Sequence, residues 1–201
     1  MLENRDYTLI VDKSGSMSTR DMPGGKTRWE AAQESTFAIA SKIETMDPDG
    51  LTIYTFSSAF KRYENVTSGK VADIWKENDP MGSTELDTVL KHAFDDFLVR
   101  RKNNTLKPNG DFIIVVTDGE PNDRGAVARA IIDLTKKIDS DKEIGICFVQ
   151  IGKDQGALKF LKQLDDDLEK QGAKFDIVGT VTLEEAEKTP LVEILLKAIN
   201  G

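Results

Sequence analysis

Short runs of β-branched and aromatic residues alternate along the chain with longer stretches whose apolar positions recur every three or four residues. The short runs predict strands because each is bounded by turn-forming Gly, Asp, Asn or Pro. Three of them are apolar enough to be covered on both faces of a sheet. The predicted strands are residues 6–11, 51–56, 111–117, 144–151 and 175–180, with a more polar edge strand at 61–66.

The stretches between the strands predict helices, because their apolar residues fall on one face at helical spacing. The last predicted helix has Thr189 as its N-cap and Pro190 at its first helical position. Alternating strands and helices indicate an α/β fold: a doubly wound, mainly parallel sheet with helices on both faces. The predicted helices are residues 29–43, 86–98, 127–138, about 156–170 and 190–199.

The composition fits one folded domain covering residues 1–201. Hydrophobic residues make up 39% of the 201 positions, which is enough for a sizeable core, and no repeat or linker divides the chain. The N-terminal apolar run is too short for a signal peptide or a membrane span, and the single cysteine, Cys147, lies in an apolar run typical of a buried thiol. We therefore expect a cytoplasmic protein, monomeric by itself.

The charge balance narrows the range of partners. The chain has 27 Lys and Arg against 35 Asp and Glu, so its net charge is −8. This charge disfavours binding to nucleic acid or to anionic membrane surfaces, because phosphates would be repelled.

Polar residues with related chemistry follow two of the predicted strands. Asp12, Ser14 and Ser16 come directly after the first strand, and Asp118 follows the strand at 111–117. In a doubly wound sheet, ligands bind beyond the carboxyl ends of the strands. A third segment, Gly82-Ser83-Thr84-Glu85, precedes a helix and offers a further hydroxyl. Carboxylates and hydroxyls without Cys or His nearby suit a hard divalent cation, Mg²⁺ above all, rather than zinc or copper.

These residues resemble the metal-ion-dependent adhesion site of the von Willebrand factor A domain family, whose pattern is D-x-S-x-S, then T, then D. Asp12, Ser14 and Ser16 match the first element, Thr84 the second and Asp118 the third. The resemblance extends over nearly the whole chain. It implies a Rossmann-like, six-stranded sheet in the order 3-2-1-4-5-6, with the short edge strand antiparallel.

The resemblance also implies how the site would work. The hydroxyls of Ser14, Ser16 and Thr84 would bind Mg²⁺, Mn²⁺ or Ca²⁺, and Asp12 and Asp118 would act directly or through water. An open position would accept an Asp or Glu side chain from a partner protein. Ser83 is an alternative to Thr84, and Glu120 and Asp123 lie beside the pattern without belonging to it. The loop that contains Arg20, Lys26 and Arg28 is expected near the rim, where it would favour an acidic partner.

Three functions remain open on the sequence. The first is a protein-binding module without enzymatic activity. The second is an adaptor subunit in an ATPase complex or in a bacterial stress-response or tellurite-resistance system. The third is a hydrolase that uses the same metal as a Lewis acid. The third is disfavoured because His92 is the only histidine, lies within a predicted helix and has no G-x-S-x-G nucleophile motif to serve.

Overall fold

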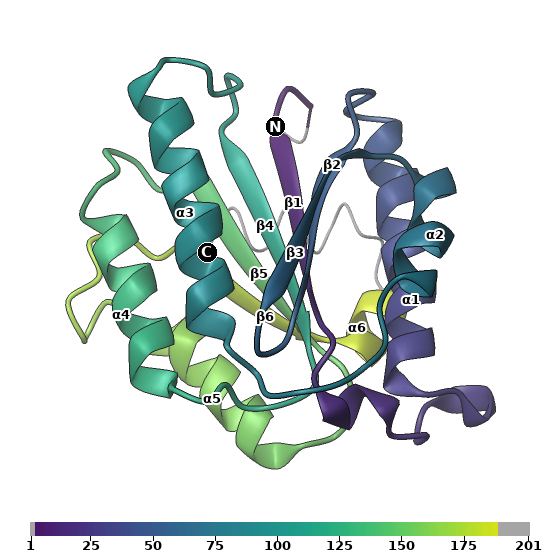
Figure 1. Ribbon diagram of the computed structural model, residues 1–201. Coiled ribbons are helices and arrows are strands. Elements are labelled where there is room, and N and C mark those ends of the chain that lie inside the picture. Colours follow the sequence, from purple (N-terminus) through teal and green to yellow (C-terminus); the bar gives the residue numbers. More distant parts are fainter. Residues whose placement is uncertain (1–2, 189–201) are drawn as a thin grey trace.

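The computed structural model describes residues 3–188, which form a six-stranded sheet in the order β3-β2-β1-β4-β5-β6 (Figure 1). All neighbouring strands are parallel except β3, which runs antiparallel to β2 at the edge of the sheet. The predicted fold class and strand order are thus confirmed. The strands are β1 (Asp6–Asp12), β2 (Leu51–Phe56), β3 (Phe60–Val66), β4 (Asp111–Thr117), β5 (Ile144–Gln150) and β6 (Val178–Thr182).

Helices cover both faces of this sheet, and each face has its own hydrophobic core. Helices α3, α4 and α5 pack with one face, whereas α1, α2 and the start of α6 pack with the other (Figure 1). Short 3₁₀ turns occur at Gly15–Ser18, Pro23–Gly25 and Ser68–Lys70. The helices are α1 (Arg28–Glu44), α2 (Val71–Lys76), α3 (Leu86–Lys102), α4 (Arg124–Thr135), α5 (Gln155–Asp166) and α6 (Leu183–Lys188).

The central strands are the most apolar and the most deeply covered. Every residue of β4 and β5 is buried, as expected for parallel strands with helices on both sides. Cys147 lies within β5, and burial raises the pKa of its thiol to about 12. The cysteine is therefore the buried thiol that the sequence predicts, protonated at neutral pH.

Some boundaries differ from those predicted. The sixth strand begins at Val178 and not at Phe175. Just before this segment, the amide of Lys174 donates to the Thr135 hydroxyl at 2.9 Å. Helix α5 ends at Asp166, where three consecutive aspartates oppose the helix dipole. Helix α4 likewise stops at Thr135, although Ile138 beyond it is buried. The predicted helix at 190–199 lies outside the described residues.

Two short helices were missed because they are too short to display a helical period. Helix α2 contributes Trp75, whose ring stacks on that of Trp29 with centroids 4.6 Å apart. The indole nitrogen of Trp75 also donates to the backbone oxygen of Trp29 at 3.0 Å. This contact joins α2 to the first turn of α1. The second missed helix, α6, follows β6 directly.

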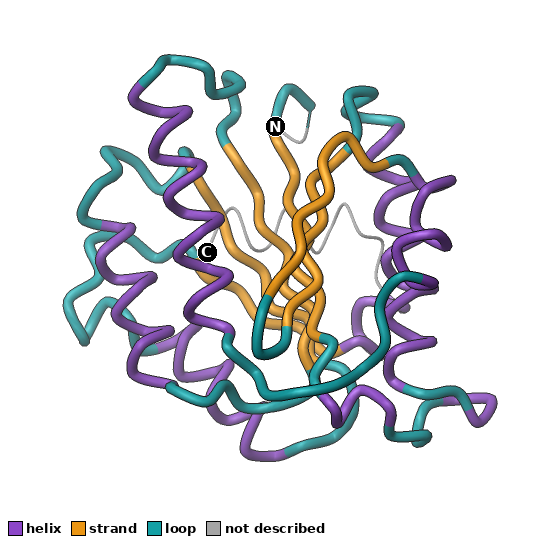
Figure 2. Tube along the Cα trace, in the orientation of Figure 1, coloured by secondary structure: helices purple, strands orange, loops and turns teal. Residues whose placement is uncertain are grey.

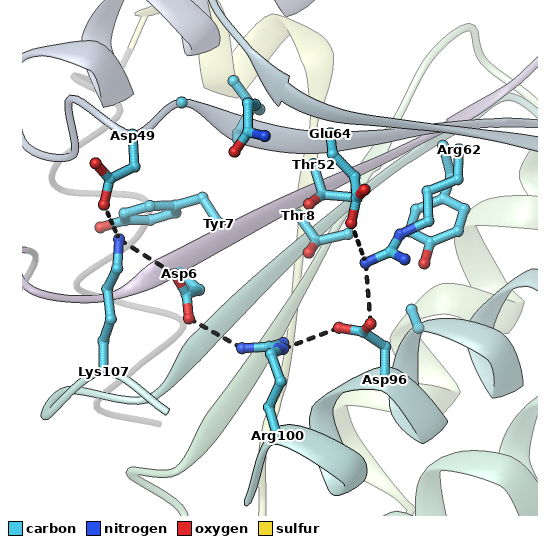
Figure 3. Close-up of a pocket in the computed structure, with 15 residues that line it drawn as sticks. Asp6, Tyr7, Thr8, Asp49, Thr52, Arg62, Glu64, Asp96, Arg100 and Lys107 are labelled. Carbon is cyan, nitrogen blue, oxygen red and sulfur yellow. Dashed lines mark hydrogen bonds and ion pairs between the residues drawn. The ribbon is translucent and has the colours of Figure 1, made fainter. Parts of the chain in front are cut away.

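A polar cleft of about 470 Å³ lies at the amino edge of the parallel strands, between the sheet and α3 (Figure 3). Its cations already have partners within the fold. Arg100 pairs with Asp6 at 2.9 Å, with Asp96 at 2.9 Å and with Asp111. Lys107 pairs with Asp6 at 3.2 Å. These ion pairs tie the end of α3 and the loop after it to the start of β1, opposite the edge that carries the predicted site.

None of the helices within residues 3–188 has the length and apolar character needed to cross a bilayer.

Gly110 provides a direct test of the turn that leads into β4. Its φ is +72°, and a Cβ at this position would collide with the backbone carbonyl of Glu143. We predict that Gly110→Ala lowers the free energy of unfolding by at least about 2 kcal/mol in denaturant titrations. Gly69 is the matched control, because its φ is not positive and a Cβ there meets no atom within 4 Å. Gly69→Ala should change stability by less than about 0.5 kcal/mol, and equal losses in both variants would contradict this interpretation.

Candidate metal centre

The two predicted carboxylates meet because their strands are parallel neighbours. Strand β1 ends at Asp12, and β4 ends at Thr117, immediately before Asp118. Val11 of β1 lies opposite Val116 of β4 in the sheet. Both carboxylates therefore lie at the carboxyl edge of the sheet, which is the lower edge in Figure 2. Each is almost fully buried, with 0% exposure for Asp12 and 1% for Asp118.

The loop after β1 turns back over this edge and brings both serines to the carboxylates. The backbone N–H of Ser14 donates to Oδ1 of Asp12 at 2.7 Å. The hydroxyl oxygens of Ser14 and Ser16 are 3.1 Å apart, and the Ser16 hydroxyl donates to Oδ1 of Asp118 at 2.9 Å. A continuous chain of hydrogen bonds thus runs from Asp12 at the end of β1, through Ser14 and Ser16, to Asp118 after β4.

Thr84 reaches the same edge on the loop before α3. The backbone N–H of Gly15 donates to the carbonyl of Gly82 at 3.1 Å, which joins this loop to the serine loop. Gly82 has a φ of +81°, and a Cβ there would lie 2.6 Å from the Ser58 hydroxyl. Only glycine fits both the conformation and the space. Thr84 itself is 8% exposed.

Asn122 fixes the position of Thr84, although sequence reasoning did not single it out. Its backbone N–H donates to the Thr84 carbonyl at 3.0 Å, and its side-chain oxygen accepts from the Thr84 amide at 3.3 Å. Ser83, the alternative to Thr84, has its hydroxyl 3.0 Å from that of Ser58. The contacts of the two neighbours therefore differ: Ser83 bonds to the loop after β2, whereas Thr84 is bound to the loop after β4.

Burial makes Asp12 costly to ionise without a cation. Removal from water, together with the nearby charge of Asp118, raises the pKa of Asp12 to about 6. Hydrogen bonds from the Ser14 backbone and from the Thr117 hydroxyl, the latter at 2.7 Å from Oδ2, favour the ionised form but do not cancel these effects. Thr117 is a second residue that the motif did not reveal, since it lies inside an ordinary strand.

Asp118 has a counter-charge of its own. Nη1 of Arg28, in the first turn of α1, donates to Oδ2 of Asp118 at 2.9 Å. Hydrogen bonds to Asp21 and Asp118 raise the pKa of Arg28, so it remains charged. The other two cations of this loop bond elsewhere: Arg20 to Glu30, and Lys26 to Glu34. Of the three basic residues that the sequence places near the rim, Arg28 thus contacts a predicted ligand.

The remaining polar residues near the motif have structural partners. Glu120 pairs with Arg124, and the Asp123 side chain caps α4 by accepting from the backbone N–H of Ala126 at 2.8 Å. Nδ1 of His92 lies 3.0 Å from the Tyr54 hydroxyl. Glu120, Asp123 and His92 thus each have a partner within the fold.

The residues at this edge fit a hard divalent cation. All the available ligand atoms are oxygens. They include the oxygens of two buried carboxylates, Asp12 and Asp118, whose negative charges repel each other. Within residues 3–188 no cluster of three or more His, Cys, Asp or Glu side chains is arranged to bind a metal. A cation here would therefore rely on the hydroxyls of Ser14, Ser16 and Thr84 in addition to Asp12 and Asp118.

The fold and this edge define a doubly wound domain with an all-oxygen site at the carboxyl ends of β1 and β4. The family model described as the von Willebrand factor type A domain matches residues 7–120. The chain belongs to this family. The match covers both aspartates, both serines and Thr84. Comparison with curated protein sequences gave no match.

Solved structures with the same fold are distant in sequence. The manganese-loaded TRAP protein of Plasmodium vivax is 18% identical with a TM-score of 0.65, covering 98% of this chain and 74% of its own. The D319A mutant of the PilB minor pilin from Streptococcus sanguinis is 13% identical with a TM-score of 0.64, covering 99% and 64%. Proximal thread matrix protein 1 from the mussel byssus is 17% identical with a TM-score of 0.64, covering 98% and 48%. At such low identities the structural likeness shows the fold alone.

The raised pKa of Asp12 predicts that a neutral residue there stabilises the metal-free protein. The folded-state pKa of about 6 exceeds the ordinary value of 3.8, so the contribution of Asp12 to stability falls as the pH rises between these values. In EDTA at pH 7.5, Asp12→Asn should raise the free energy of unfolding by about 1–3 kcal/mol. This gain should shrink towards pH 4. Because Asp111, whose pKa is also raised to about 6 by burial, is present in both proteins, its contribution cancels. A less stable Asp12→Asn protein at pH 7.5 would contradict the prediction.

Proposed function

We propose that this von Willebrand factor A domain is a divalent-metal-dependent protein-binding module that captures an acidic side chain of a partner protein. The cation would be held by Asp12, Ser14, Ser16, Thr84 and Asp118, the pattern of a metal-ion-dependent adhesion site. The observation that carries the proposal is the convergence of two buried carboxylates with the hydroxyl chain of Ser14 and Ser16.

The charge at the site supports an acidic ligand. The negative charges of Asp12 and Asp118 would balance a divalent cation, while neutral hydroxyls complete the protein's share of the ligands. When bound, a cation in such surroundings supplies an electrophilic centre for one more carboxylate oxygen. The TRAP structure is that of the manganese-loaded protein, which supports Mn²⁺ or Mg²⁺ as the occupant here.

A binding role is favoured over metal-dependent hydrolysis. Hydrolysis needs a group that activates water beside the metal. His92 is engaged by Tyr54, while Glu120 and Asp123 are engaged by Arg124 and by the start of α4. The chain is therefore proposed to act through what it binds, as an adhesion or scaffold module or as the adaptor subunit of an ATPase or of a bacterial tellurite-resistance complex. We propose a cytoplasmic monomer that binds neither nucleic acid nor membranes.

The adjacent hydroxyls of Ser83 and Thr84 allow a matched test of the metal site. Thr84→Val keeps the shape of the side chain and removes the proposed ligand, so it should weaken Mg²⁺ binding in calorimetric titrations by about tenfold or more. Ser83→Ala removes a hydroxyl that bonds to Ser58 and should leave the affinity within about twofold of wild type. The reverse order of effects would assign the ligand to Ser83, and equal affinities in all three proteins would contradict the proposed site.

Partner capture tests the second half of the proposal. Immobilised wild type should retain a partner from cell extract in Mg²⁺ and release it into EDTA, because the proposed contact requires the cation. Thr84→Val should lose this partner and Ser83→Ala should keep it. Retention that is equal in EDTA, or equal on Thr84→Val, would show that the interaction does not use the metal site.

A further inference from the structure

Hydrogen bonds connect Arg28 to the candidate metal centre. Its Nε donates to Oδ1 of Asp21 at 3.0 Å, and its Nη2 donates to Oδ2 of Asp21 at 2.7 Å. The third nitrogen, Nη1, is left to bond with Asp118. Only 15% of the Arg28 side chain is exposed, so the ion pair between Arg28 and Asp118 is poorly solvated. One guanidinium thus bridges a surface aspartate and a proposed metal ligand.

A glycine leaves space for this arginine, and its two carboxylate partners offset an unfavourable position in the helix. Gly152, just beyond β5, has a φ of +78°, and a Cβ there would lie 2.9 Å from Nε of Arg28. Arg28 is also the first residue of α1, where a positive charge opposes the helix dipole. The favourable contacts with Asp21 and Asp118 offset this unfavourable position. A side chain at position 152 would therefore displace Arg28 from its place at the carboxyl edge of the sheet.

The charges at this edge balance differently with and without a divalent cation. Without one, the Arg28 guanidinium pairs with one of the two ligand carboxylates, Asp118, and it is shared between Asp118 and Asp21. With one, Asp12 and Asp118 would already be balanced, and Arg28 would retain Asp21 as its own partner. A divalent cation held by Asp118 would repel the Arg28 guanidinium, whose Nη1 lies 2.9 Å from Oδ2 of the same carboxylate, because both are positively charged.

We propose that Arg28 is a built-in counter-cation that competes with the divalent metal for Asp118 and thereby sets the metal affinity of the site. Metal binding displaces Nη1 from Asp118, while Nε and Nη2 keep the arginine on Asp21. Arg28 stabilises the metal-free site and lowers its affinity for the metal. This inference rests on the proposed function, because it requires the cation to bind at Asp12 and Asp118.

Calorimetric titration with Mn²⁺ alone tests the competition. Arg28→Gln should bind Mn²⁺ about tenfold more tightly than wild type, because a competing charge is lost. Arg20→Gln is the matched control. It makes the same change in net charge shortly before α1, at a side chain that bonds to Gly25 and Glu30. Its affinity should stay within about twofold of wild type. Equal or weaker binding by folded Arg28→Gln would overturn the inference.

A second measurement uses the wild-type chain and does not depend on whether the variant folds. The Nη1–H signals of Arg28, recorded at low temperature in ¹⁵N-labelled protein, should shift on addition of saturating Mg²⁺ because Nη1 loses its bond to Asp118, whereas those of Arg20 should not. Unchanged Nη1–H signals of Arg28 under saturation would overturn the inference.

The titration separates the two proposals. If wild type and Arg28→Gln both fail to bind Mn²⁺, the proposed function fails and the inference with it. If wild type binds Mn²⁺, Asp12→Asn abolishes this binding, and Arg28→Gln binds no better than wild type, the metal site stands and only the competition is refuted. Binding by Arg28→Gln alone, lost again when Asp12→Asn is added, would support the competition in its strongest form.

Discussion

The candidate site is organised around the repulsion between two carboxylates, Asp12 and Asp118, that parallel strands bring to one buried edge. Neither carboxylate is free to turn into water, because β1 and β4 lie in the middle of the sheet. Their charges must therefore be met by hydrogen bonds, by a proton or by a cation. The surrounding residues supply each of these. Serine and threonine hydroxyls bond to both carboxylates, the pKa of Asp12 is raised, and Arg28 pairs with Asp118.

This constraint links the fold to the proposed function. The loops that follow β1 and precede α3 are joined by backbone hydrogen bonds, so the hydroxyls come to the carboxylates with little freedom. A divalent cation would relieve the repulsion more completely than one arginine does, because it carries twice the charge and can bind several oxygens at once. Stability of the metal-free chain and affinity for metal are therefore opposed, and Arg28 is proposed to set the balance between them.

The strands and most of the helices could be predicted from the sequence because they depend on local patterns, whereas the strand order that brings Asp12 and Asp118 together was implied by the family resemblance. Parallel buried strands appear as apolar runs, and the D-x-S-x-S spacing places its side chains on one turn. The sequence did not predict the contacts of Asn122 with Thr84, of Thr117 with Asp12, or of Arg28 with Asp118, because each joins residues distant along the chain.

The central claim is that the carboxyl edge of β1 and β4 holds a divalent cation. Anomalous X-ray diffraction from crystals grown in saturating Mn²⁺ tests it most directly, because the signal locates the metal without reference to any variant. The account predicts one strong anomalous peak within bonding distance of oxygens from the set Asp12, Ser14, Ser16, Thr84 and Asp118. A map with no peak at this edge, or with Mn²⁺ bound only elsewhere, would contradict it.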